Sequence, residues 1–199
     1  KTGHFKEPVY YSELEKVRAI FPLVVGQEPL KNTPKEKPLD GCLFWAIDLT
    51  KCEHYDLKKH GIELSELFRF LWYYLLSSIF DDIACHPGII LCEDIGYMGL
   101  GDMMAFSSAI KPIENDLNEL FYGCVPLKMK KVIIVNSPWW MNFLIGFMRL
   151  FMSKKMSSRI KNDTTEKMYS RVGGPANIPS GYIGGTGSST ERYYQDPKV

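Results

Sequence analysis

The stretch PLKMKKVIIVNSPWWMNFLIGFMRLFMSKKMSSRI, residues 126–160, decides how this chain is organised. It opens with three lysines and passes into the apolar run 132–135, in which all four residues are β-branched. A run without a polar face is typical of a central strand that is covered on both sides, usually in a parallel sheet. The turn Asn136-Ser137-Pro138 then leads into the nearly all-apolar segment 139–152, which predicts a helix, and the stretch ends in further basic residues.

The predicted helix 139–152 has more apolar surface than one packing face uses. On a helical wheel its polar or smallest residues form one narrow stripe: Asn142, Gly146, Arg149 and Ser153. A surface helix needs only about a third of its circumference to be apolar. Two interpretations remain open: a fully buried helix, or a helix that packs on the protein body and faces a lipid-like ligand or a membrane with another side. The segment is too short to span a bilayer, which takes about 20 apolar residues.

Strands and helices alternate along the preceding part of the chain. The pattern predicts strand 42–49, amphipathic helix 62–82, strand 88–95 and helix 102–121. We expect Asp102 to cap the second of these helices and Pro112 to kink it. Alternating strands and helices give right-handed parallel crossovers, so the predicted fold class is α/β, with an open, mostly parallel sheet flanked by helices.

The two ends of the chain differ in composition from this central part. Residues 1–37 contain four prolines, and 12–20 predict a short helix with a capping-box pattern at its start. From residue 173 the chain is rich in Gly, Pro and Ser, and residues 188–199 are expected to form a flexible tail. We therefore expect one main domain over 38–187, preceded by an appendage.

The charge distribution indicates contact with anions. Hydrophobic residues make up 45% of the chain and the net charge is +1, as in an ordered globular domain. Residues 126–171 nevertheless hold ten Lys or Arg against two acidic residues, a local net charge of +8, so the remainder carries −7. Such a basic section favours phosphates on a membrane surface, and no nucleic-acid-binding motif accompanies it. The five cysteines are odd in number and form no CxxC pair, which indicates a reduced, cytoplasmic protein.

Motifs for catalysis or cofactor binding are not found in the sequence. Gly96, Gly99 and Gly101 follow a strand, but their order is GxxGxG rather than the dinucleotide fingerprint GxGxxG. There is no GxxxxGK[ST] loop and no GxSxG elbow, and the four histidines lack metal-ligand spacing. Glu93 and Asp94 are adjacent carboxylates at a strand end, but neighbours on a strand point to opposite faces and cannot act as a pair. We expect a solvated or hydrogen-bonded strand end there, and a protein that is not an enzyme and holds no cofactor or metal.

Three segments carry a resemblance to a known family. They are GIILCEDI (88–95), the opening stretch 126–160 and IPSGYIGGT (178–186). Their order is a strand with an acidic end, then proline, basic residues, strand, Asn-x-Pro, aromatic helix and Arg-Ile, and finally a segment ending in Gly-Gly-Thr. In this order the chain resembles the lipid-binding CRAL-TRIO domain, also called the Sec14-like domain. Residues 1–37 then resemble the end of the helical segment that usually precedes this domain.

The resemblance implies an open α/β sheet that forms the floor of an apolar lipid pocket, covered by a mobile gate helix. Members bind and carry tocopherol, retinoids, squalene or phospholipids without catalysis. The expected partners are therefore a hydrophobic small molecule or lipid of the tocopherol, retinoid or phospholipid class, and a phosphoinositide membrane surface. The gate maps to 139–152, and we expect a monomer that is peripheral at membranes.

The site residues that the resemblance implies fall into two groups. In the animal tocopherol- and retinal-carrier branch, which the pattern resembles most, a basic patch beside the gate contacts phosphoinositide headgroups. The matching positions here are Lys128, Lys130, Lys155 and Arg159. The pocket and gate are expected to use apolar side chains: Trp139, Trp140, Phe143, Leu144, Phe147, Met148, Phe151, Leu71, Leu75, Phe106 and Ile110.

Some positions depart from the family. The fungal phosphatidylinositol-transfer branch has a glutamate where this chain has Leu127 and a lysine where it has Arg159, which argues against an inositol lipid in the pocket. The usual His-x-Gly after Arg-Ile is replaced by Lys161-Asn162-Asp163. Two functions stay open: a carrier that moves a hydrophobic ligand between membranes, or a non-transferring lipid-sensing or recruitment module of a larger signalling protein. An α/β enzyme is a third alternative, which the missing motifs disfavour.

Overall fold

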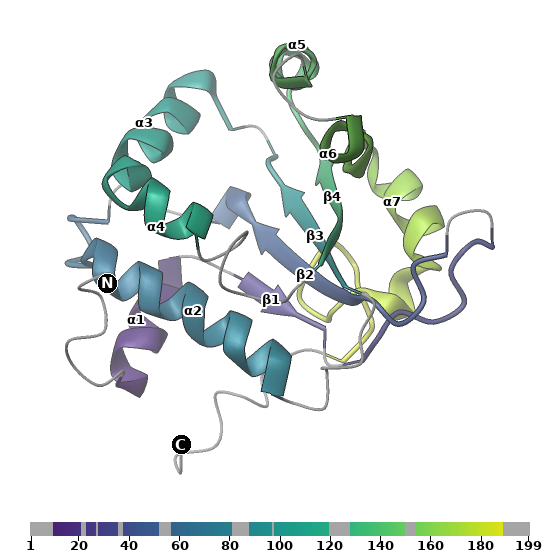
Figure 1. Cartoon of the computed structure of the whole chain (residues 1–199), viewed down its shortest axis with the longest axis horizontal. Helices are drawn as coiled ribbons and strands as arrows, with labels where there is room; N and C mark the ends of the chain where they lie inside the picture. The colour runs from purple at the N-terminus through teal and green to yellow at the C-terminus, as the bar shows by residue number, and fades with distance from the viewer. Residues whose placement is uncertain are drawn as a thin grey trace. The chain divides into compact units, whose positions relative to one another are not determined.

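A computed structural model of the protein describes residues 10–20, 23–26, 28–35, 38–51, 57–80, 88–96, 98–119, 128–149 and 154–188. The chain divides into two compact units, and Figure 1 labels most of their helices and strands. The helical unit comprises Lys1–Pro22, Lys51–Cys85 and Gly99–Leu127. The sheet unit comprises Leu23–Thr50, His86–Met98 and Lys128–Val199. Each unit is thus assembled from segments that lie far apart in the sequence.

A five-stranded sheet forms the centre of the sheet unit, and its strands lie side by side in chain order. β1 (Leu23–Val25) is antiparallel to β2 (Leu43–Asp48). β3 (Ile89–Asp94), β4 (Met129–Val135) and β5 (Ile160–Asp163) continue the sheet in parallel. A 3₁₀ turn, η2 (Leu49–Lys51), follows β2. The predicted α/β class with a mostly parallel sheet is confirmed.

The sheet has two more strands than the three we predicted. β1 is only three residues long, and β5 has the sequence IKND, in which every residue is partly exposed. β1 is apolar but too short to stand out as a strand, and β5 is polar, as edge strands often are. Because β1 pairs with β2, the predicted boundary between residues 37 and 38 falls between two hydrogen-bonded strands.

One face of the sheet is closed by α7 (Thr165–Val172) and by the chain that follows it through η7 (Pro175–Asn177). Alternate strand residues point to this face, and their side chains are fully buried. They are Phe44, Ala46, Ile90, Cys92, Ile133 and Val135. Met168, Val172, Ile178 and Tyr182 pack against them from the other side, and we call this the packed face.

β4 is followed by α5 (Trp139–Arg149) and α6 (Lys154–Arg159). The turn before α5 forms as predicted, and Asn136 adopts a positive φ of 52°, a conformation that asparagine tolerates better than most residues. α5 matches the first part of the predicted helix 139–152. Residues 150–152 of that prediction lie outside the part of the chain that the structure describes.

The helical unit contains α1 (Tyr11–Ile20), α2 (Leu64–Phe80), α3 (Leu100–Ile110), η5 (Lys111–Ile113) and α4 (Glu114–Glu119). The predicted kink at Pro112 is confirmed, since the helix is interrupted there by the 3₁₀ turn η5. The predicted N-cap was wrong. Gly99 occupies that position, and Asp102 lies three residues inside, where its carboxylate accepts a hydrogen bond from the Gly99 N–H at 3.1 Å.

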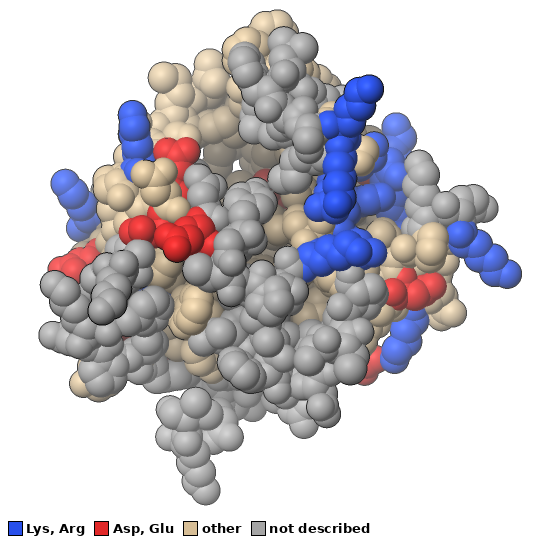
Figure 2. Space-filling view, in the orientation of Figure 1, with Lys and Arg blue, Asp and Glu red and all other residues tan. Residues whose placement is uncertain are grey.

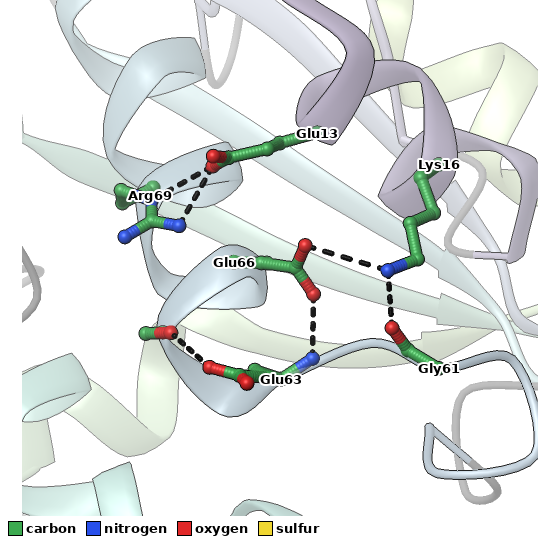
Figure 3. A network of polar contacts seen from close by, with 7 residues as sticks. Glu13, Lys16, Gly61, Glu63, Glu66 and Arg69 are labelled. Atoms are coloured by element: carbon green, nitrogen blue, oxygen red, sulfur yellow. Dashed lines mark hydrogen bonds and ion pairs between the residues drawn. The ribbon is translucent and has the colours of Figure 1, made fainter. Parts of the chain in front are cut away.

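A polar network holds α1 against the start of α2 (Figure 3). Arg69 donates to Glu13 through two nitrogens, at 3.0 and 2.7 Å. Lys16 forms an ion pair with Glu66 at 3.4 Å and also donates to the backbone oxygen of Gly61. α1 therefore forms as the sequence predicted, and its charged side chains tie it to α2.

Three further observations concern the described residues. None of their helices combines the length and apolarity needed to cross a bilayer. Their His, Cys, Asp and Glu side chains do not gather in groups of three or more that could hold a metal ion. Cys42 and Cys92 both carry buried free thiols.

Candidate functional site

The second face of the sheet is only partly covered. In register across β2, β3 and β4, one row consists of Trp45, Leu91 and Val132, and the next of Ile47, Glu93 and Ile134. Ile47, Leu91, Glu93 and Val132 are partly exposed, whereas the residues of the packed face are fully buried. We call these two rows the open face. The second of these rows lies near the carboxyl ends of the strands, where ligands usually bind in open α/β sheets.

Glu93 is the one acidic residue in these two rows. Its neighbours across the sheet are Ile47 and Ile134, and among the described residues its carboxyl group has neither a hydrogen-bond nor an ion-pair partner. Burial raises the pKa of Glu93 to about 7, because the charged form loses hydration in an apolar setting. Glu93 is thus partly exposed, without a hydrogen bond among the described residues, and lies between apolar neighbours on the adjacent strands.

Asp94 follows the prediction of a hydrogen-bonded strand end. Its side chain accepts from the Gly96 N–H at 3.0 Å and from the Asn136 side-chain amide at 3.2 Å. Asn136 in turn accepts from the Thr165 hydroxyl at 3.3 Å. Asp94 thus holds the ends of β3 and β4 together, on the face opposite to Glu93, as strand alternation requires.

Trp45 contributes a second polar group without a partner to the open face. Its side chain is 3% exposed, and its indole N–H is buried with no hydrogen-bond acceptor among the described residues. Leaving a buried donor unpaired costs about 1–3 kcal/mol. Such a group calls for an explanation, because most buried polar groups in native proteins are paired.

α5 presents two different sides. Met141 and Ile145 are buried, whereas Trp139, Phe143 and Phe147 are exposed by 85%, 79% and 54%. The three exposed rings are four residues apart, so they form one stripe along the helix, which we call the aromatic stripe. A fully buried helix is therefore excluded. Of the other predicted gate residues, Trp140 and Leu144 are partly exposed, and the side chains of Met148 and Phe151 lie outside the described part.

An asparagine bridge connects α5 to the edge of the sheet. The Asn162 side chain on β5 donates to the Asn142 side chain on α5 at 2.6 Å. Asn162 also accepts from the Ser137 hydroxyl at 2.7 Å, in the turn between β4 and α5. These three side chains hold α5 near the carboxyl ends of β4 and β5.

The four predicted basic residues lie close together. The pKa of Lys128 is lowered mainly by the positive charge of Lys130, and also by Lys155 and Arg159. Lys128 and Lys155 are exposed, and Lys130 and Arg159 partly so. In Figure 2, Lys and Arg side chains gather where α6 and α7 lie in Figure 1. We call Lys128, Lys130, Lys155 and Arg159 the basic patch.

A β-bulge shapes the start of β4. Ile89 pairs with Met129, but Ile90 pairs with Lys131, so Lys130 is left out of the ladder. Bulges re-aim side chains next to functional sites, and this one removes Lys130 from the position opposite Ile90. Gly88 permits the close approach, since a Cβ there would lie 2.3 Å from the Lys128 carbonyl oxygen.

The helical unit contains a groove of about 750 Å³, within the usual range for small-molecule sites. It is lined mainly by small and apolar residues near the start of α2 and along α3: Leu57, Ile62, Leu64, Ala105, Ala109 and Pro112. Of the pocket residues predicted on these helices, Leu71 is buried and Ile110 partly exposed. The side chains of Leu75 and Phe106 lie outside the described part.

The sequence pointed to Glu93 but did not place it beside Trp45 on one face of the sheet. Strand alternation separates Glu93 from Asp94, and it also puts Trp45 on the same side as Glu93 once β2 and β3 are in register. That register comes only from the pairing of two strands 40 residues apart in sequence. The sequence therefore showed which side chains alternate along each strand, but not how β2 pairs with β3.

These features define a class of protein: an α/β domain with an apolar, partly covered sheet face, an exposed aromatic helix and an adjacent basic patch. Residues 46–185 match the family model described as the CRAL/TRIO domain, and the chain therefore belongs to the CRAL/TRIO family. Proteins of this family bind hydrophobic small molecules or lipids. A comparison with curated proteins gave no match.

Proposed function

We propose that this protein carries a hydrophobic small molecule or lipid between membranes and docks on phosphoinositide-containing surfaces. The aromatic stripe supports the proposal most. Three large apolar side chains on one side of α5 are exposed to water at a cost that a soluble role does not explain, whereas an interfacial helix buries such residues among lipid headgroups. The protein would act at membrane surfaces as a peripheral carrier, without catalysis.

The basic patch supplies the attraction to anionic headgroups in this proposal. Lys128 lies directly before β4 and Lys130 at its start, whereas Lys155 and Arg159 lie on α6, so the two pairs flank α5 along the chain. Their mutual repulsion is relieved when a phosphate group approaches all four. Binding should weaken as salt rises, because screening shortens the range of the attraction.

Headgroup contact and movement of α5 are linked in the proposal. α5 is already hydrophobic on its outer side, so insertion of Trp139, Phe143 and Phe147 into the interface requires no prior opening. A membrane can shift α5 away from the position seen in the structure only through contacts that it makes with the shifted helix and not with the helix as observed. The aromatic stripe and the basic patch are the groups available for such contacts.

A transfer assay tests the proposal. Labelled α-tocopherol and labelled phosphatidylcholine, one at a time, pass from neutral donor vesicles to acceptors with or without phosphatidylinositol bisphosphate. Lys128→Gln/Lys130→Gln should slow transfer to the phosphoinositide acceptors and leave affinity for the probe in solution unchanged. The matched control, Lys35→Gln/Lys111→Gln, removes two exposed charges elsewhere and should transfer like the wild type.

Other results would lead to other conclusions. If transfer and solution affinity fall together in the patch variant, the lysines support the fold and docking through them is wrong. If a probe binds but is never transferred, the carrier role is wrong and the protein is a lipid-sensing or recruitment module.

A further inference from the structure

α6 carries an exposed serine inside the basic patch. Ser158 lies between Lys155 and Arg159, the two patch residues of this helix, and its side chain is exposed. Its hydroxyl group donates to the backbone oxygen of Lys155 at 2.8 Å, which is a local bond within the helix. The docking proposed above gives this hydroxyl group no role.

The helix places this hydroxyl group beside two lysines. Residues three and four positions apart are neighbours on a helix surface. Lys155 and Lys154 precede Ser158 by three and four positions, and both side chains are exposed. The neighbouring Ser157 is only partly exposed and has one lysine at these two spacings. Ser158 is therefore the position at which an added phosphate group meets two ammonium groups.

We propose that Ser158 is a phosphorylation site and that its phosphate group switches off docking of the basic patch on phosphoinositide membranes. The inference rests on the proposed function and adds its regulation. A protein kinase joins the Ser158 Oγ to the γ-phosphorus of ATP. The bond from that phosphorus to ADP breaks, and the hydroxyl proton passes to the kinase. α6 holds three basic residues and no acidic one, so it fits a kinase with an acidic substrate groove.

α6 is suited to enter a kinase active site. It has six residues, and none of its described side chains is buried. A helix this short has little stability of its own, because the first turn costs more than its few hydrogen bonds return. Such segments open locally while the core of a domain stays folded. The hydroxyl group then has to give up only its bond to Lys155.

The phosphate group competes with a lipid headgroup for the same charges. A phosphoserine carries a charge of about −1.5 to −2 at pH 7, whereas the four side chains of the basic patch each carry one positive charge. Lys155 also lies close enough to Lys128 to lower the pKa of Lys128. A phosphate beside Lys155 therefore offsets about half of the patch charge and repels anionic lipid.

Vesicle flotation tests the switch on protein that carries phosphoserine at position 158, installed by amber suppression. The vesicles are phosphatidylcholine with or without phosphatidylinositol bisphosphate. Binding to the phosphoinositide vesicles should weaken by about thirtyfold, equivalent to losing two basic residues near an anionic surface. Binding to neutral vesicles should not change. Phosphoserine at position 107, exposed on α3 and outside the basic patch, adds the same charge and should bind like the unmodified protein.

Two further measurements concern the phosphate group itself. Phosphorus NMR should give the phosphoserine at position 158 a pKa below the usual value of about 6, because Lys154 and Lys155 favour the doubly charged form. Lys154→Gln should raise that pKa. Incubation of the wild type with ATP, Mg²⁺ and the catalytic fragment of protein kinase C should place phosphate on Ser158, as read by mass spectrometry.

The outcomes separate the switch from the docking beneath it. If phosphoserine at position 158 leaves phosphoinositide binding unchanged, or weakens it no more than phosphoserine at position 107, the switch is overturned and docking stands. Phosphate on Ser157 alone, or on neither serine, overturns the modification site. An ordinary phosphate pKa overturns the pairing with Lys154 and Lys155. If the unmodified protein binds neutral and phosphoinositide vesicles equally, the proposed docking fails and the switch with it.

A second variant decides if circular dichroism shows that phosphoserine at position 158 unfolds the protein. Ser158→Glu adds one negative charge at the same place. It should weaken binding to phosphoinositide vesicles by about fivefold, as for one basic residue lost. Ser158→Glu that binds like Ser158→Ala overturns the switch.

Discussion

Glu93 makes the stability of this protein depend on pH in a way that one substitution isolates. Its pKa is raised from 4.5 to about 7 by burial. Between these two values the folded protein keeps a proton on Glu93 that the unfolded chain has lost. The free energy of unfolding therefore falls as pH rises through this window, since it decreases wherever the folded state binds more protons.

The size of this effect follows from the shift. A displacement of about 2.5 pKa units corresponds to about 3 kcal/mol, at about 1.4 kcal/mol per unit. This figure is an upper limit, because Glu93 is partly exposed and water stabilises its charge. The strand residues beside it, Ile47 and Ile134, carry no charge, so burial alone determines the shift.

Glu93→Gln removes the titrating group and keeps the shape of the side chain. Urea unfolding followed by circular dichroism, at several pH values from 4.5 to 8, gives the free energy of unfolding of both proteins. We expect the variant to gain up to about 3 kcal/mol relative to the wild type between the two ends of this range. The difference curve cancels all other titrating groups, and Glu119→Gln, at an exposed position, should give a flat one.

The reasoning is refuted if the difference between wild type and Glu93→Gln stays constant across this range. Glu93 would then be hydrated in the folded state. A difference of the opposite sign would mean that its charged form has a partner in the folded protein.

Three further predictions concern α5 and the start of β4. Asn142→Ala removes the hydrogen bond to β5, so we expect faster transfer of a labelled lipid between vesicles at unchanged solution affinity. Phe143→Ser should weaken binding to neutral vesicles in a flotation assay by on the order of tenfold, because one apolar side chain no longer leaves water. Tyr10→Ser, also at an exposed aromatic residue, is its control. Gly88→Ala should lower the free energy of unfolding by about 1–3 kcal/mol, since its Cβ would lie 2.3 Å from a backbone oxygen at a φ of 143°; Gly146→Ala meets nothing within 4 Å and should not destabilise.

Each of these has a result that contradicts it. Transfer by the Asn142 variant at the wild-type rate means that the asparagine bridge does not restrain α5. Vesicle binding that is equally weakened by the Phe143 and Tyr10 variants means that α5 is not the inserting element. A Gly88 variant as stable as the Gly146 variant means that β4 has room to shift.

The sequence by itself determined the strands and helices that bury continuous apolar surface. The run 132–135 and the segment 88–95 identify central strands, because only residues covered on both faces lack a polar side. The excess apolar surface of 139–152 left open whether this helix is fully buried or faces a ligand or membrane, and only the exposure of Trp139, Phe143 and Phe147 excluded the first. Family membership followed from the same segments, and residues 46–185 confirm it.

Tertiary structure alone decided which polar groups face which surface. β1 and β5 have no pattern of their own, and hydrogen bonding to a neighbouring strand makes them part of the sheet. Convergence of the basic patch depends on a bulge and on the placement of α6, neither of which local propensity encodes. Glu93 lies in an apolar setting because β2 and β4 place isoleucines on both sides of it, a long-range pairing that no window of sequence contains.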